Sequence, residues 1–112
     1  MAGDPEEARQ RLSSLSGGTR RMLDYVAVLE GGARYALLRH IGRLPEPDMI
    51  QNLHEAVEAG LLAGVPGQPN TYDFTDDSVR AIVLAEIGEQ RLPKLRARAE
   101  AARGRVEGPQ TV

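Results

Sequence analysis

The chain of 112 residues is long enough for one domain with a modest core, and its composition, 41% hydrophobic and 27% charged, is ordinary for a globular protein. There is no cysteine, which excludes disulfide and thiolate chemistry. The sequence also has no apolar run near the ~20 residues of a membrane span and no apolar stretch of a secretory signal, so we expect a cytoplasmic protein. The formal net charge of −2 lacks the basic excess usual in freestanding nucleic-acid-binding proteins.

The N-terminal part is predicted to form two helices. Residues 4–7, Asp-Pro-Glu-Glu, combine a capping aspartate, a proline suited to the first helical position and a capping-box glutamate, so a lead helix is predicted to run to about Leu15. Ser16 is the predicted cap of a second helix, which Gly31 and Gly32 stop. The apolar residues of this second helix that share one face are Met22, Leu23, Val26 and Leu29.

Two further helices are predicted on either side of a tight connection. The third covers residues 33–41, and residues 42–46 lead to a fourth helix that Pro47 opens. The apolar positions that recur at helical spacing along the fourth helix are Ile50, Leu53, His54, Val57 and Leu61. With these toward the core, the opposite face carries Asp48, Gln51, Asn52, Glu55 and Glu58. We expect this opposite face to be a solvated or protein-facing interaction surface.

A hairpin and another helix follow. Residues 61–65 and 71–74 are predicted strands, and the Pro- and Gly-containing residues 66–70 join them as a turn. Thr75 or Asp76 is the predicted cap of the next helix, where negative side chains suit the positive N-terminal end.

The last predicted helix runs from about Leu92 to Arg103 and is basic. Its cations, against Glu100 alone, are Arg91, Lys94, Arg96, Arg98, Arg103 and Arg105. They form either a patch for an anionic partner or a solvated helix face, and the second interpretation is favoured. Its apolar stripe is thin and consists of Leu92, Leu95, Ala99, Ala102 and Val106. Because so little apolar area offsets ordering entropy weakly, we expect the helix from Ala99 onward to be mobile or to dock on another chain.

This order of elements predicts a mostly helical α+β fold. The order of the predicted elements is the order found in a winged helix-turn-helix with a short β-hairpin wing, with extra N- and C-terminal helices. The predicted divisions are a lead helix at 1–15, the winged-helix domain at 16–90, the basic helix at 91–106 and a disordered tail at 107–112.

Roughly residues 12–103 resemble a known family. The segments LSGGTRRMLDYVAVLEGG, LLRHIGRLPEPDMIQNLHEAVEAGLL and YDFTDDSVRAIVLAEI follow one another as in the winged-helix domain of bacterial STAND-type regulators. Those are large AAA-like NTPases that include LuxR-family and SARP-like transcriptional regulators. The family pattern after the wing is F-x-H-x-x-V/I-R, in which Phe74, Asp76 and Arg80 take the first, third and last places. Asp76 stands where histidine is usual, so any contact of that histidine is in doubt.

The resemblance implies that the chain is a fragment of a larger regulator. In such proteins this domain relays nucleotide state, and a separate C-terminal helix-turn-helix reads DNA. The implied partners are the neighbouring NTPase and helical-repeat domains of the same protein, with ATP bound only in an upstream domain. The chain itself has no phosphate-binding loop of the form G-x-x-x-x-G-K-[ST], so we expect no cofactor in it.

The remaining chemistry points away from catalysis and DNA. His40 and His54 show no metal-ligand spacing, and no acid, base and nucleophile form a recognisable set. Gln51 and Asn52 could read adenine edges, but residues 44–79 contain seven acids and no lysine or arginine to bind phosphates. We therefore expect a non-catalytic interaction and coupling module with a protein partner and no membrane contact. The alternative is a small winged-helix transcription factor that binds DNA directly.

Overall fold

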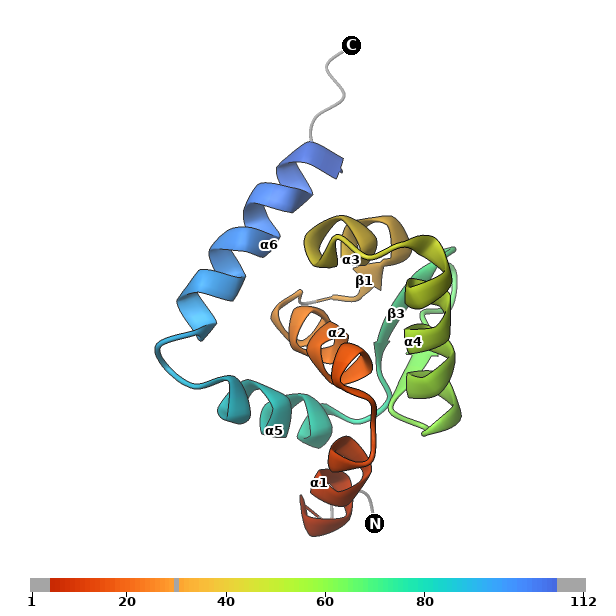
Figure 1. Ribbon diagram of the computed structural model, residues 1–112, viewed down its shortest axis with the longest axis vertical. Coiled ribbons are helices and arrows are strands. Elements are labelled where there is room, and N and C mark those ends of the chain that lie inside the picture. Colours follow the sequence, from red (N-terminus) through yellow and green to blue (C-terminus); the bar gives the residue numbers. More distant parts are fainter. Residues whose placement is uncertain (1–4, 30, 107–112) are drawn as a thin grey trace.

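The computed structural model describes residues 5–29 and 31–106 (Figure 1). The elements in order are α1 (Pro5–Ser13), α2 (Gly17–Val28), β1 (Ala33–Arg34), α3 (Tyr35–Gly42), α4 (Glu46–Glu58), β2 (Leu62–Gly64), β3 (Thr71–Phe74), α5 (Asp77–Ile87) and α6 (Leu92–Val106). The chain is therefore mostly helical with a small sheet, which confirms the predicted α+β class. The predicted cap Asp4 and the predicted tail at 107–112 lie outside the described residues.

The strands form one antiparallel sheet in the order β1-β3-β2. Leu62 of β2 lies opposite Phe74 of β3, and Ala33 of β1 lies opposite Tyr72 on the other edge of β3. The sequence placed Ala33 in a helix, and that prediction is wrong. Positive φ angles of 87° and 108° at the two preceding glycines turn the chain, and the fully buried Ala33 then extends along β3 before α3 begins.

Two predicted caps are present. The side chain of Ser16 accepts a hydrogen bond from the backbone amide of Thr19 at 3.3 Å and starts α2. Of the two candidates for α5, the cap is Asp76, whose carboxylate accepts from the amide of Ser78 at 2.9 Å. The hydroxyl of Thr75 instead donates to the carbonyl of Gly60 at 2.7 Å and ties the end of the hairpin to the end of α4.

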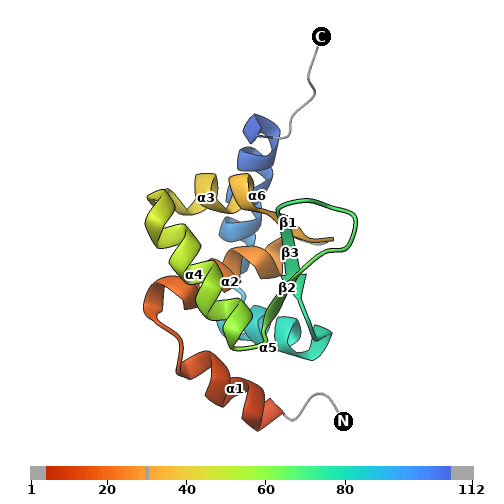
Figure 2. The ribbon, with the colours of Figure 1, turned by 90° about the vertical axis from the view of Figure 1, so that its right-hand side faces the viewer.

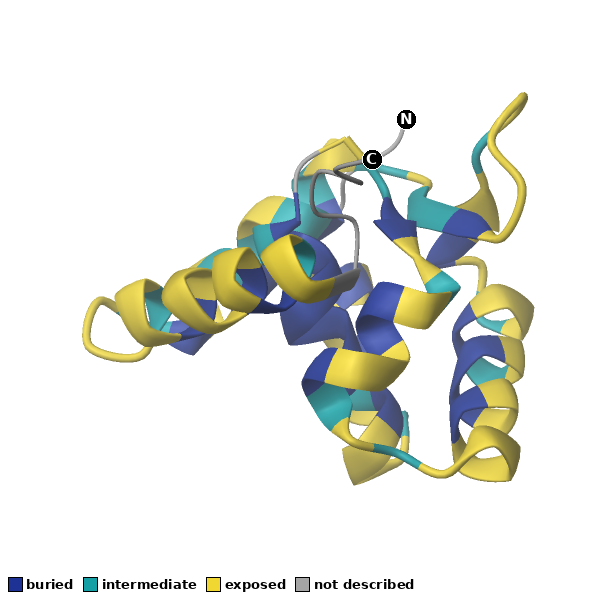
Figure 3. Cartoon of the chain, turned by 90° about the horizontal axis from the view of Figure 1, so that it is seen from above, coloured by how far each residue is buried: buried dark blue, intermediate teal, exposed yellow. Residues whose placement is uncertain are grey.

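Helix α2 is the centre of the fold. It contacts α3, α4, α5, α6 and strand β3, and Figure 1 shows it between these elements. Its predicted apolar face is buried, as are the inward residues of α3, Leu37, Leu38 and Ile41. Figure 3 shows the buried residues on the faces that the helices turn toward one another. Burial of this single cluster is the main stabilising contribution to the fold.

Helix α4 is rotated about its axis relative to the prediction, so a different face of the helix turns toward the core. Ile50 and Val57, predicted to be core residues, are 55% and 41% exposed, and His54 is exposed. The buried residues of α4 are Met49, Asn52, Leu53 and Ala56. Met49, Leu53 and Ala56 also recur at spacings of four and three, so periodicity alone allowed either setting. The small Ala56 and the polar Asn52 on the buried face let α4 pack beside the polar first turn of α2.

Helix α6 packs against α2 and α3 along most of its length. Leu95, Ala99 and Ala102 are buried, whereas Leu92 is half-buried. The predicted mobility or docking on another chain from Ala99 onward stays a prediction, and in this structure Ala99 and Ala102 pack on the body of the same chain. Alanine at two successive contact positions allows close approach of the helices, so Ala99 and Ala102 are buried although the apolar stripe is thin. The side chain of Val106 lies outside the described part of the chain.

Candidate functional site

The predicted interaction face of α4 is divided between the interior and the surface. Asp48, Gln51 and Glu58 are exposed, as predicted. Asn52 is buried, with its side-chain oxygen 3.2 Å from the hydroxyl oxygen of Thr19, so its prediction as a surface residue is wrong. A buried amide with this partner cannot read a base edge.

Glu55 also turns toward α2 and is only partly exposed. Its carboxylate accepts hydrogen bonds from the Thr19 hydroxyl at 2.5 Å and from the Ser16 amide and hydroxyl, each at 2.9 Å. These bonds, the one from Thr19 foremost, lower the pKa of Glu55 below its ordinary value. Glu55 therefore caps the first turn of α2 and does not belong to an open interaction face.

Helix α4 also exposes apolar side chains on the side that faces the sheet. Ile50, His54 and Val57 face a groove of about 540 Å³ between α4 and the sheet. Its other lining residues are Tyr35, Glu46, Leu53, Asn70 and Tyr72. Figure 2 shows α4 and the strands side by side on this part of the molecule. We call this surface the α4 groove.

The rim of the α4 groove carries negative charge. Glu46 accepts a hydrogen bond from the hydroxyl of Tyr35 at 3.4 Å, at the end of the groove where α4 begins. Desolvation, and then the charge of Glu46, raise the pKa of Tyr35. Sequence reasoning missed the groove because it placed Ile50 and Val57 in the core. The sequence feature that could have revealed the groove is the second apolar set of α4, Met49, Leu53 and Ala56. When this set faces the core, Ile50 and Val57 are exposed.

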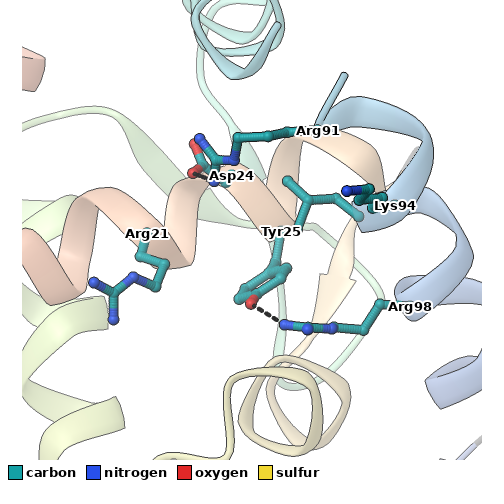
Figure 4. A pocket seen from close by; sticks show the side chains of 7 residues that line it. Arg21, Asp24, Tyr25, Arg91, Lys94 and Arg98 are labelled. Carbon is teal, nitrogen blue, oxygen red and sulfur yellow. Dashed lines mark hydrogen bonds and ion pairs between the residues drawn. The ribbon is translucent and has the colours of Figure 1, made fainter. Parts of the chain in front are cut away.

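The predicted basic helix is also divided. Arg91, Lys94 and Arg98 line a pocket of about 300 Å³ between α2 and α6, which we call the α2–α6 pocket (Figure 4). The lining residues from the rest of the chain are Arg21, Asp24, Tyr25 and Leu95. Arg96 and Arg105 are exposed and do not line this pocket. Arg103 is half-buried, with a guanidinium nitrogen 4.0 Å from the carboxylate of Glu100.

Three of the six predicted cations therefore line the same pocket, together with residues of α2 that lie about 70 positions earlier in the chain. Their spacing in the sequence, three and four apart, already placed them on one face of a helix. The contribution of Tyr25 and Arg21 could not be foreseen, because it depends on α6 packing against α2.

The family-pattern residues have structural roles here. Phe74 is half-buried at the end of β3, and Asp76 caps α5. Hydrogen bonds from the amide and then the hydroxyl of Ser78 lower the pKa of Asp76. The guanidinium of Arg80 donates to the carbonyl of Ala27 at 3.1 Å and to the carboxylate of Asp73 at 3.4 Å. Arg80 thereby joins α5 to the end of α2 and to β3.

His40 and His54 are both exposed, and the described residues contain no group of three or more histidines and acids that could hold a metal ion. None of the described helices combines the length and the apolar character that a membrane crossing requires. The chain matches no family model, and comparisons with curated proteins and with solved structures find no significant similarity.

Proposed function

We propose that the chain is a non-catalytic interaction module with a winged helix-turn-helix fold, and that it binds an amphipathic helix of a protein partner in the α4 groove. The order α2, β1, α3, α4, β2, β3 supports this fold, as does the sheet order β1-β3-β2. A short connection separates α3 from α4, and Arg43 in it adopts a left-handed conformation with φ of 53°. In this fold α4 is the helix that DNA-binding relatives insert into the major groove.

The observation that carries the proposal is the exposure of Ile50 and Val57 on α4. They are the exposed large apolar side chains of the described residues, and both line the same groove. Tyr35 and Tyr72 add aromatic surface to it. A concave apolar surface on an element that is otherwise solvated is typical of a groove that receives the apolar face of a helix.

The charge around the α4 groove selects the partner. Glu46 lines the groove, Asp48 and Glu58 are exposed on the same helix, and no lysine or arginine is among the lining residues. A DNA backbone would be repelled by this surface, because phosphate contacts depend on cations. A helix with apolar residues at spacings of three and four and with arginine or lysine on its flanks would be attracted to it. The partner is thus a basic amphipathic helix.

The resemblance to STAND-type regulators suggests where this helix comes from. In such a parent protein the module would couple the nucleotide-binding domain to the helical repeats, and the partner helix would belong to one of them. The chain would then act by changing which of its neighbours occupies the α4 groove, without chemistry of its own.

The test is a titration of the isotope-labelled chain followed by backbone NMR shifts. The first probe is a helical peptide with leucine at spacings of three and four and arginine on both flanks. The control peptide has the same composition with the leucine spacing scrambled. We expect saturable shifts centred on Ile50, His54 and Val57 with the first peptide and not with the control. Ile50→Ser should abolish them, whereas Gln51→Ser, also on the exposed side of α4, should not.

A DNA titration separates the alternative. Duplex DNA at about 0.1 M salt, where phosphate contacts remain strong, should produce no sequence-dependent shifts in α4. Sub-micromolar, sequence-dependent shifts at Gln51 would establish direct DNA reading and overturn the proposal. Equal shifts with the ordered and scrambled peptides, or none with either, would also overturn it.

A further inference from the structure

The α2–α6 pocket has a positively charged wall built from one face of α6. Arg91 lies just before α6, and Lys94 and Arg98 follow on its first two turns. All three line the same pocket, where like charges at these spacings repel one another. A bound anion would remove this repulsion.

The acid in the pocket does not neutralise this wall. Asp24 is the only acid among the described residues that line the pocket, and it is buried. Its carboxylate lies 2.6 Å from a guanidinium nitrogen of Arg20, which lies outside the lining. Arg91 approaches the other carboxylate oxygen at 3.6 Å. Arg20 also pairs with Glu86, so Asp24 is compensated by Arg20 and Arg91 together, and the pocket keeps the charges of Lys94 and Arg98.

A buried tyrosine orients one of these cations. The guanidinium of Arg98 donates a hydrogen bond to the hydroxyl oxygen of Tyr25 at 3.1 Å. Tyr25 is only 6% exposed, so its ring is fixed by the core and the guanidinium is held with it. Because the hydroxyl accepts from Arg98, its own proton can be donated to a ligand. Figure 4 shows Arg98 pointing at this hydroxyl and Arg91 pointing at Asp24, with Arg21 extending away from both.

We propose that the α2–α6 pocket binds the phosphate group of a small ligand, with Lys94 and Arg98 as its main charged contacts and Tyr25 as a neutral donor. This site is distinct from the α4 groove, shares no lining residue with it and does not depend on the proposed protein partner.

The donors favour phosphate over a carboxylate. The lining offers a guanidinium fork, an ammonium group and a hydroxyl from two helices, which suits a tetrahedral dianion with several acceptor oxygens. A carboxylate has one charge and would leave part of this wall uncompensated. The volume of about 300 Å³ is at the lower end for ligand pockets, so it suits a small phosphorylated compound or free phosphate.

Calorimetric titration of the full chain at about 0.1 M NaCl in a phosphate-free buffer tests this, since that salt concentration screens distant charges. The probes are inorganic phosphate, phosphoserine as a phosphate monoester, and acetate. We expect phosphate to bind with a dissociation constant of about 1 mM or tighter, within the usual limit of binding energy per ligand atom. Acetate should bind at least about tenfold more weakly. Tighter binding of phosphoserine would identify a phosphorylated compound, and equal binding would identify free phosphate.

Matched variants decide whether the pocket is responsible. Lys94→Gln and Arg98→Gln should each weaken phosphate binding by at least about tenfold, because each removes a charge-assisted hydrogen bond. Arg96→Gln removes the same charge from the same helix outside the pocket and should weaken binding by less than about twofold. Tyr25→Phe should weaken binding without loss of the folded state. An equal effect of Arg96→Gln, equal binding of acetate, or no saturable binding at about 10 mM phosphate would overturn the proposal.

Discussion

The carboxylate of Glu55, in the second half of α4, lies 2.5 Å from the hydroxyl of Thr19, in the first turn of α2. The same carboxylate accepts hydrogen bonds from the amide and the hydroxyl of Ser16, so one acid satisfies donors at the start of a helix 36 to 39 residues earlier. The negative charge also lies at the positive end of α2. The contact therefore fixes how α4 is rotated against α2 and, through that rotation, which residues α4 exposes.

Glu55→Gln should reduce the dependence of stability on acid pH. The hydrogen bonds, that from Thr19 foremost, lower the pKa of Glu55 from its ordinary value near 4.5 in the folded state. A lowered folded-state pKa stabilises the protein above the unfolded pKa, and this stabilisation is lost as pH falls through the lower folded value. Thermal melts should thus show the wild-type chain losing more of its stability than Glu55→Gln as the pH falls below about 4.5.

The matched control for that experiment is Glu58→Gln, on the exposed side of the same helix. Its melting curve should follow the wild-type curve at every pH. Asp76, whose pKa is also lowered, contributes to the acid dependence of all three proteins and cancels in the comparison. Parallel curves for wild type and Glu55→Gln would mean that the Glu55 contact is not formed in solution.

The rotation of α4 is tested by two neighbouring substitutions. Met49 is fully buried, so Met49→Ala should reduce the free energy of unfolding by about 2–5 kcal/mol. Ile50 is 55% exposed, so Ile50→Ala should change it by less than about 0.5 kcal/mol. Chemical denaturation measures both. A larger loss from Ile50→Ala than from Met49→Ala would support the predicted rotation, in which Ile50 faces the core.

Local sequence patterns predict contacts within one helical turn but not contacts between segments far apart in the chain. The caps Ser16 and Asp76 were predictable because a cap depends on residues within one turn. The rotation of α4 was not, because Ile50 and Met49 each belong to an apolar set with helical spacing and the choice depends on contacts with α2. The two-residue strand β1 gave no periodic signal, since its pairing with β3 depends on residues nearly 40 positions away.

In the two candidate sites as well, local features were predictable and contacts between distant segments were not. The basic character of α6 was visible in the sequence, but the α2–α6 pocket was not. It needs Tyr25 of α2 to meet Arg98 of α6 across 73 residues. The α4 groove was not predicted, because the sequence prediction placed Ile50, which lines it, in the core.

Arg80 should stabilise the fold through its two acceptors. It is 16% exposed and joins the carbonyl of Ala27 to the carboxylate of Asp73. Arg80→Ala should therefore cost about 1–3 kcal/mol of unfolding free energy, because both acceptors lose a charged donor. Arg80→Lys should recover only part of this loss, because an ammonium group cannot reproduce the planar fork. Arg96→Ala, at an exposed position, should have little effect, and a similar loss there would contradict this role of Arg80.

The packing of α6 is tested by two alanines on opposite sides of the helix. Ala99 is 2% exposed, whereas Ala101 is exposed. Leucine has nearly the same helix propensity as alanine, so a difference between the two sites reports packing. Ala99→Leu should overpack the contact with the helices beside α6 and cost about 1–3 kcal/mol, whereas Ala101→Leu should change stability by less than about 0.5 kcal/mol. Chemical denaturation, with amide exchange across residues 95–105, provides the measurement. Equal stabilities together with rapid exchange from Ala99 onward would mean that the second half of α6 is detached in solution, as its thin apolar stripe first suggested.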